Sequence, residues 1–215
     1  ARTPHARWLL LCLVLLGTQA WVGLGYALAS TSVSFNGLEE PQVRPAFQSE
    51  PKVGGLLPTL SFDSRDNMFT PTQGSYLELS AGLFNQALGS DSDFQRVNLT
   101  AIHYRPLARD LTLGVMGSSV LRVPVMRYQG DFAAQVETEL RWQLWERFSL
   151  VGFAGAGGTR NEGSRNRASQ NVTTGGFGLR YEIARKYGLH MGLDVAYGPT
   201  GPVYYVQFGS AWMGP

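Results

Sequence analysis

The fold is decided by residues 134–144, which read AQVETELRWQL and alternate between apolar and polar side chains. Successive side chains of a β-strand point to opposite faces of the sheet. One face of this segment is therefore mostly apolar, whereas the other, with Gln, Glu, Glu, Arg and Gln, is wholly polar. The segment predicts a β-strand that contacts water on one side only.

The same alternation recurs along the chain at intervals of about 20 residues. It is clear in residues 77–83, 176–183 and 189–198, and the body of the chain has no apolar stretch long enough for a transmembrane helix. An all-β fold of about ten strands is therefore expected. The predicted strands are residues 21–35, 56–66, 74–85, 94–105, 110–121, 132–144, 148–159, 173–184, 188–198 and 203–212.

Alternation alone leaves two partners open for the apolar face, a second sheet in a soluble sandwich or lipid around an outer-membrane barrel. The predicted strands run to about 10–13 residues, nearer to a tilted membrane strand than to the 5–6 residues usual in soluble sheets. Connections are short after every second strand, as at 106–109 and 145–147, and mostly longer between them, as at 36–55 and 160–172. Short turns at one rim and long loops at the other are typical of outer-membrane barrels, so a transmembrane antiparallel β-barrel is favoured. Aromatic residues gather near the strand ends, as an interfacial girdle would require: Trp142, Trp145, Phe148, Tyr181, Tyr187, Tyr197, Tyr204 and Trp212.

Composition and the first residues agree with export. Charged residues are 16% of the chain, against about 25% in an average soluble protein, and the net charge of +2 gives no reason to expect nucleic acid. Arg2 and Arg7 precede an apolar run over 8–16, and residues 18–20 are suited to cleavage, which predicts a signal peptide over 1–20 and a barrel domain over 21–215. A buried N-terminal helix and a cut after Ala29 are the alternatives.

A longer motif carries a family resemblance. Residues 57–84 read LPTLSFDSRDNMFTPTQGSYLELSAGLF. This stretch resembles the barrel of the bacterial surface-antigen family, which includes the BamA- and TamA-type assembly proteins, where a D-x-R-D-N segment leads through a P-T-x-G turn into the next strand. The resemblance extends over about residues 53–213 and implies a sixteen-stranded barrel, of which these would be the last ten strands. It also implies insertion or translocation of other proteins at the outer membrane, although no segment of this chain reads as one of the family's periplasmic POTRA domains.

The resemblance further implies a latch between a loop arginine and acids of the barrel wall. Arg122 would be the arginine, and Glu137 and Glu139 its partners. The sequence departs from the family in two places, because Val123 stands where glycine is expected and Gly155 where a third acid is usual. A solvated loop arginine is the alternative.

Two further groups of residues are predicted from the strand faces. Charged side chains on the wet face should form a network that neutralises itself inside the barrel: Glu78, Arg141, Arg180, Glu182 and Asp194. An aromatic-rich last strand resembles the signal by which barrels are recognised for insertion: Tyr204, Val206, Phe208 and Trp212.

No enzyme, metal site or cofactor is predicted. The single cysteine, Cys12, lies in the leader, and no His, Asp or Glu cluster has metal-ligand spacing. His190 and Asp194 share a face but lie about 13 Å apart on a strand, too far for neighbours in a triad, so only a serine on another strand could complete a hydrolase site. We therefore expect an insertion or translocation barrel, with a small passive pore as the alternative. The expected partners are outer-membrane lipid, unfolded outer-membrane clients and a periplasmic or POTRA-bearing protein.

Overall fold

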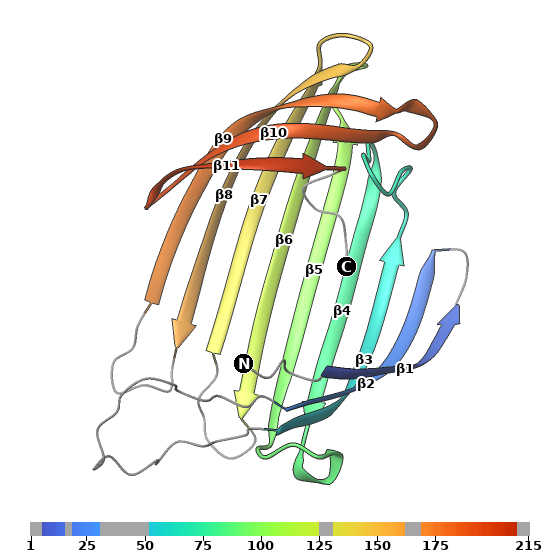
Figure 1. Ribbon diagram of the computed structural model, residues 1–215, viewed down its shortest axis with the longest axis vertical. Coiled ribbons are helices and arrows are strands. Elements are labelled where there is room, and N and C mark those ends of the chain that lie inside the picture. The colour runs from blue at the N-terminus through green and yellow to red at the C-terminus, as the bar shows by residue number, and fades with distance from the viewer. Residues whose placement is uncertain (1–5, 16–18, 31–51, 125–130, 162–168, 210–215) are drawn as a thin grey trace, which may run out of the picture.

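The chain forms a single antiparallel sheet in which every strand pairs with its neighbours in sequence (Figure 1). The structure, a computed structural model, describes residues 6–15, 19–30, 52–124, 131–161 and 169–209. The all-β prediction is confirmed. The strands are β1 (Ala6–Leu15), β2 (Ala20–Ser30), β3 (Lys52–Asp63), β4 (Gly74–Phe84), β5 (Phe94–Pro106), β6 (Leu111–Pro124), β7 (Asp131–Gln143), β8 (Phe148–Asn161), β9 (Ser169–Ala184), β10 (Leu189–Gly198) and β11 (Gly201–Phe208), with short 3-10 helices η1 (Gln86–Leu88) and η2 (Arg185–Tyr187).

Each of the ten predicted strands corresponds to one of β2 to β11, with ends that differ by a few residues. The structure has one strand more, because β1 lies within the stretch predicted as a signal peptide and pairs with β2. Its sequence, ARWLLLCLVL, is apolar at nearly every position and so lacks the alternation that marks the other strands. Cleavage of residues 1–20 concerns processing and stays a prediction.

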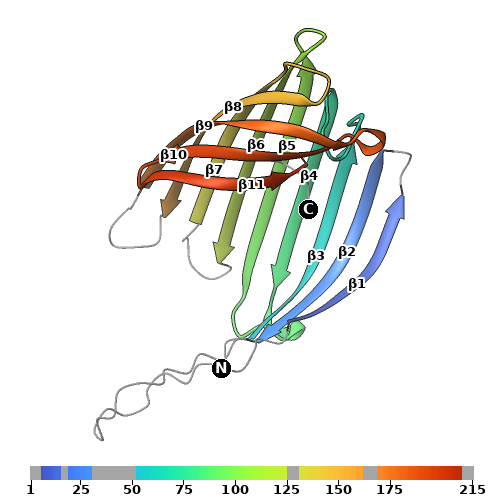
Figure 2. The same ribbon diagram turned by 45° about the horizontal axis from the view of Figure 1, so that its top comes forward.

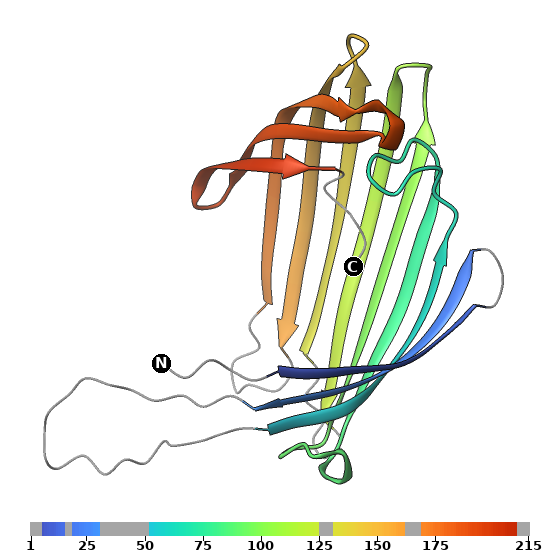
Figure 3. The same cartoon turned by 45° about the vertical axis from the view of Figure 1, so that its right-hand side comes forward.

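The sheet is strongly curved and has an inner, concave face (Figures 1 and 2). The end of β9 together with β10 and β11 bends across the opening towards the connection between β3 and β4, whereas β1 and β2 form the opposite margin (Figure 3). In the described part of the chain, β1 and β11 are the two ends of the sheet and each pairs on one side only. Closure into a complete barrel remains a prediction.

The two faces of the sheet differ in the way that the alternation predicts. On the outer face, Leu77, Leu140 and Leu179 are 45, 42 and 46% exposed. The inner face carries the buried cluster of Tyr76, Ile102, Tyr104 and Met116 together with buried charged side chains. Because the described strands form one sheet, no second sheet among them covers the apolar face, so the soluble sandwich is wrong. An exposed apolar surface of this extent is suited to lipid.

The connections divide between two rims. At one rim the chain passes from β1 to β2, β3 to β4, β5 to β6, β7 to β8 and β9 to β10, and at the other it passes from β2 to β3, β4 to β5, β6 to β7, β8 to β9 and β10 to β11. We call them the short-turn rim and the long-loop rim. Among the described residues, no helix is long and apolar enough to cross a membrane.

Candidate functional site on the inner face

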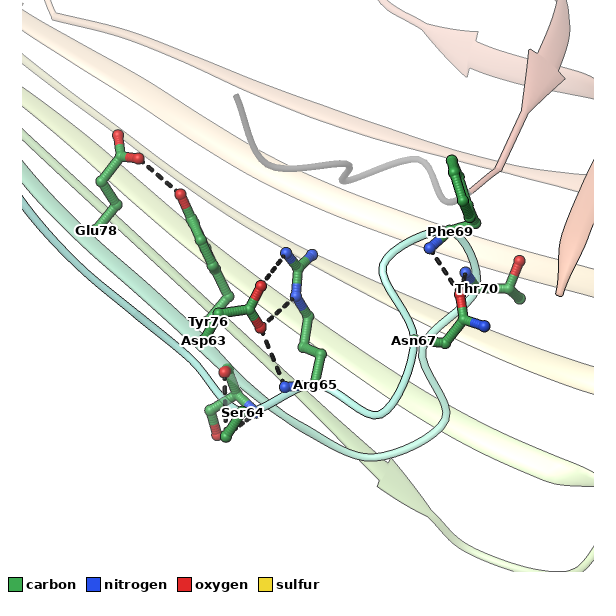
Figure 4. A network of polar contacts seen from close by, with 9 residues as sticks. Asp63, Ser64, Arg65, Asn67, Phe69, Thr70, Tyr76 and Glu78 are labelled. Atoms are coloured by element: carbon green, nitrogen blue, oxygen red, sulfur yellow. Dashed lines mark hydrogen bonds and ion pairs between the residues drawn. The ribbon is translucent and has the colours of Figure 1, made fainter. Parts of the chain in front are cut away.

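The connection between β3 and β4, residues 64–73, is held in shape by its own motif (Figure 4). The carboxylate of Asp63 accepts hydrogen bonds from the Arg65 backbone N–H at 3.0 Å and from its Nε and Nη2 at 2.9 and 2.8 Å. The Arg65 guanidinium also lies over the Tyr76 ring, 4.7 Å from its centroid. Hydrogen bonding to Asp63 raises the pKa of Arg65 and outweighs the effect of burial. The first part of the motif thus fixes the chain where it leaves β3.

The rest of the motif closes the loop back onto β4. The carboxylate of Asp66 accepts from the Thr72 N–H at 2.9 Å, from the Gln73 N–H at 3.3 Å and from the Thr72 hydroxyl. Burial alone would raise the pKa of Asp66, but these hydrogen bonds outweigh burial and hold the pKa below its usual range. Gly74 has a φ of 105°, and a Cβ there would overlap the carbonyl oxygen of Ser64. The aspartate and the final glycine are therefore required by the backbone of this turn.

The middle of the loop crosses to the far wall of the sheet. Asn67 Nδ2 donates to the Tyr187 carbonyl at 3.0 Å, and the Thr70 hydroxyl donates to the Gly188 carbonyl at 2.6 Å. The same hydroxyl oxygen lies 2.9 Å from His190 Nδ1, a residue 120 positions away in the sequence. Thr70 is 9% exposed. The loop therefore joins the β3–β4 margin to η2 and β10 at the short-turn rim (Figures 1 and 3).

A buried charge network stands beneath this loop. Arg180 and Asp194, 4 and 6% exposed, form an ion pair with Nη2 to Oδ2 at 2.9 Å, and Nη2 also donates to Gln207 Oε1 on β11 at 2.9 Å. Two glycines leave the space for it, since a Cβ at Gly178 would overlap Asp194 Oδ1 and one at Gly192 would overlap Arg180 Nη1. The pair thereby connects β9, β10 and the last described strand.

The other residues predicted for the network are divided among three places. Arg141 is buried and donates from Nη2 to the Pro71 carbonyl at 2.6 Å, so it supports the loop. Glu78 lies on β4, where its Oε2 accepts from the Tyr76 hydroxyl at 2.6 Å. Glu182 is 3.9 Å from Arg185 Nε at the short-turn rim. The structure therefore brings together Arg180 and Asp194, whereas Glu78 lies on the same inner face but on the distant strand β4.

The predicted latch needs a correction, because Arg122 does not meet Glu137 or Glu139. Arg122 lies near the end of β6, and its guanidinium stands over the Phe94 ring at 4.5 Å. In the register of β6 and β7 it faces Asp131, whereas Glu137 faces Met116, six positions further along. At about 3.3 Å per residue the separation is roughly 20 Å, beyond the reach of an arginine side chain.

The last strand has the facing that its sequence predicted. Tyr204, Val206 and Phe208 lie on β11 with exposures of 75, 65 and 55%. Trp212 lies outside the described residues. Recognition of this strand as an insertion signal stays a prediction.

A contact between Ser75 and His103 was not predicted from the sequence. Ser75 Oγ lies 2.9 Å from His103 Nδ1 across β4 and β5, on the outer face near the short-turn rim. A serine hydrolase also needs oxyanion donors, and the Ser75 N–H already donates to Ser64 Oγ at 3.0 Å. The register of an antiparallel pair could have revealed the contact, because the two residues face each other. Among the described residues, no cluster of three His, Cys, Asp or Glu side chains could hold a metal ion.

Two cavities adjoin the inner-face groups. One of about 410 Å³ lies under the loop and is lined by residues that include Asp66, Thr70, Arg141 and His190. The other, of about 390 Å³, is lined by residues of β7 to β11 that include Glu139, Arg180 and Asp194. Both are bordered by polar and charged side chains.

One curved antiparallel sheet with an apolar outer face and a charged inner face defines the class of outer-membrane β-barrel proteins. Residues 55–131 match the family model of the Omp85 superfamily domain. Over these residues the chain is similar to the Omp85 superfamily domain, and the resemblance to the bacterial surface-antigen family is confirmed at that level. The comparison with curated proteins finds no match. The matched segment includes the whole β3–β4 loop.

Proposed function

We propose that this chain is the membrane-embedded part of a protein insertion or translocation machine of the BamA and TamA type in the bacterial outer membrane. The observation that carries the proposal is the Omp85 match over residues 55–131, together with the β3–β4 loop within it, which reaches the opposite wall. Members of this superfamily are outer-membrane proteins, which supports the location.

The proposed arrangement assigns a separate task to each part of the sheet. The apolar outer face contacts lipid, and the Arg180–Asp194 pair keeps the wall near the last strands rigid. The short-turn rim faces the periplasm, as in other outer-membrane barrels. An unfolded client that arrives from the periplasm therefore meets the β3–β4 loop first.

We further propose that the chain works with a partner. The outer edges of β1 and β11 have no strand beside them among the described residues. Unpaired backbone groups in hydrocarbon cost several kcal/mol each, so these edges need each other or another chain. A periplasmic or POTRA-bearing protein would also supply the client-receiving surface.

Reconstitution in liposomes tests the proposal. The purified chain is mixed with an unfolded outer-membrane client, and client folding is followed by the change in gel mobility between unboiled and boiled samples. We expect rates close to those of empty liposomes for the chain alone, and a clear acceleration when a POTRA-bearing protein of the same bacterium is added. Absence of acceleration with every such partner would contradict the assembly function.

A small passive pore is the second candidate, favoured by the polar cavities of about 390 and 410 Å³ along the inner face. A pore should give steady conductance in planar bilayers without any client and should leave client folding unchanged. An assembly barrel closed by its loop should give little conductance. We expect no enzymatic activity from either.

A further inference from the structure

The outer face changes from apolar to polar on β4 and β5, close to the short-turn rim. Towards this rim, the outward side chains of β5 change from Ala101 to His103 and then Arg105. On β4 they change from Leu77 to Ser75, which faces His103 in register. We call Ser75, His103 and Arg105 the polar notch. It lies at the margin of the apolar outer wall, which is the level of the lipid headgroups in an outer-membrane barrel.

The polar notch presents hydrogen-bond donors to the outside of the sheet. Ser75 Oγ lies 2.9 Å from His103 Nδ1. When this hydroxyl donates to Nδ1, the neutral ring carries its proton on Nε2, which is then a donor for a ligand. Arg105 is exposed, and among the described residues it forms no hydrogen bond or ion pair. Both side chains can therefore donate to a group that lies against the outer wall.

The charge of the polar notch favours an anion. On the described strands β3 to β6, the outer face carries no Asp or Glu, because Asp63 and Glu78 are the acids of these strands and both point inward. Each of these two carboxylates is hydrogen-bonded to another inner-face side chain. In the adjoining turns, Asp66 and Asp110 accept hydrogen bonds from Thr72 and Trp142. The positive charge of Arg105 is therefore left to attract a negative group.

The wall beside the polar notch is suited to hydrocarbon chains. Leu77 on β4 and Leu99 on β5 are 45 and 41% exposed and lie further from the rim on the same face. Phe62, which faces Leu77 in register, is 39% exposed. A ligand with an anionic phosphate and attached hydrocarbon chains would use both the notch and this wall, whereas a free phosphate would use the notch alone.

We propose that the polar notch binds the phosphate of an anionic phospholipid in the leaflet at the short-turn rim, with the hydrocarbon chains of the lipid against Leu77 and Leu99. Arg105 supplies the positive charge, and His103 Nε2, oriented by Ser75, donates to a phosphate oxygen. The proposal requires that the outer face contacts lipid and does not depend on the assembly function.

Native mass spectrometry of the full chain, folded in a non-ionic detergent, tests the proposal. The chain is titrated with palmitoyl-oleoyl phosphatidylglycerol, with phosphatidylcholine of the same chains, which has no net charge, and with the corresponding diacylglycerol, which lacks the phosphate. The fraction of the chain that carries lipid gives an apparent dissociation constant. We expect phosphatidylglycerol to bind at least about fivefold more tightly than either of the other two lipids.

Substitutions in the chain assign this preference to the polar notch. Arg105→Gln should weaken phosphatidylglycerol about five- to tenfold because the charge is removed, and Ser75→Ala should weaken it a few-fold because His103 loses its orienting partner. Arg96→Gln is the matched control, since Arg96 lies on the inner face of the same strand and donates from Nε to Asn98 Oδ1 at 3.0 Å. The control should bind like the unaltered chain.

The other outcomes distinguish a lipid from a free phosphate compound. sn-Glycerol 1-phosphate carries the phosphate without hydrocarbon chains, and its displacement of phosphatidylglycerol at comparable concentrations would overturn the assignment to a lipid. If Arg105→Gln does not fold, His103→Leu replaces it, with an expected loss of a few-fold in affinity. Absence of phosphatidylglycerol binding, equal binding of the three lipids, full affinity in Arg105→Gln, or an equal loss in Arg96→Gln would also overturn the proposal.

Discussion

The two ends of the inner face hold their arginines in different ways. Towards the short-turn rim, Arg180 is 4% exposed, is paired with Asp194 and extends to Gln207 on the last described strand. At the long-loop end, Arg122 is exposed and rests on the ring of Phe94, which itself stacks on Phe84 at 4.4 Å. Both arginines stand on one face of one sheet. We therefore expect that the burial of each arginine and the partner it contacts, more than its position along the strand, decide how much it contributes to the free energy of unfolding.

The largest effect is expected from Arg180→Ala, with Arg122→Ala as its comparison. Loss of Arg180 leaves Asp194 buried and unpaired, which costs about 3–5 kcal/mol, whereas a cation–π contact at an exposed site is worth about 0.5–1 kcal/mol. Urea unfolding of both variants in detergent, followed by tryptophan fluorescence, measures the two free energies. Equal losses would mean that the two ends of the inner face are held alike.

Glycine substitutions test how tightly the Arg180–Asp194 pair is held without removing a charged side chain. A Cβ at Gly178 overlaps Asp194 Oδ1, whereas a Cβ at Gly152 on β8 meets nothing within 4 Å. Gly178→Ala should therefore lose about 1–3 kcal/mol through forced displacement of the ion pair, and Gly152→Ala should lose nothing. Urea unfolding of both variants, followed as above, measures the two losses of unfolding free energy. A neutral Gly178→Ala would show that the pair can shift without cost.

The loop at the short-turn rim should be sensitive to one hydroxyl group. Thr70→Val keeps the shape of the side chain but removes the hydroxyl that donates to the Gly188 carbonyl and lies beside His190 Nδ1, at a cost of about 1–2 kcal/mol. The rim should also become more accessible to a protease added on the side of the proteoliposome membrane where this rim is exposed. Thr173→Val, at an exposed position of β9, is the control, and a similar loss in both variants would mean that the loop contact adds nothing.

Acid should weaken the loop through Asp66, with the smallest effect of the four. The pKa of this carboxyl is lower in the folded protein, so its contribution is complete above the unfolded value of about 3.9 and is lost as the pH falls through the folded value. The melting temperature of Asp66→Asn should therefore lie below that of the unaltered chain at pH 7, and the difference should be smaller near pH 3. A constant difference at both pH values would assign the loss to packing.

The strands were predictable because each has two different environments. Where one side of a strand faces lipid and the other faces a polar interior, the residues alternate, as in 134–144, and β7 is found there. The motif in 57–84 was readable for a similar reason, since Asp63, Asp66 and Gly74 act on backbone atoms a few residues away. Such local requirements appear directly in the order of residues.

The errors occurred where that local signal is absent. β1 was missed because nearly all of its residues are apolar, which removes the alternation. Arg122 was assigned to Glu137 and Glu139 from a family pattern, although the register of β6 and β7 separates them by six or more positions. The Ser75–His103 contact depends in the same way on the pairing of two strands.

By itself, the sequence determined the all-β fold, the number and facing of β2 to β11, and the turn chemistry of the β3–β4 loop. All of these depend on the alternation of side chains along one strand or on hydrogen bonds within about ten residues. Only the tertiary structure decided that Thr70 meets His190, that Arg180 pairs with Asp194, and that Glu139 is buried on the inner face. These contacts arise from the curvature of the sheet and the register between strands, which are set by the packing of the whole inner face.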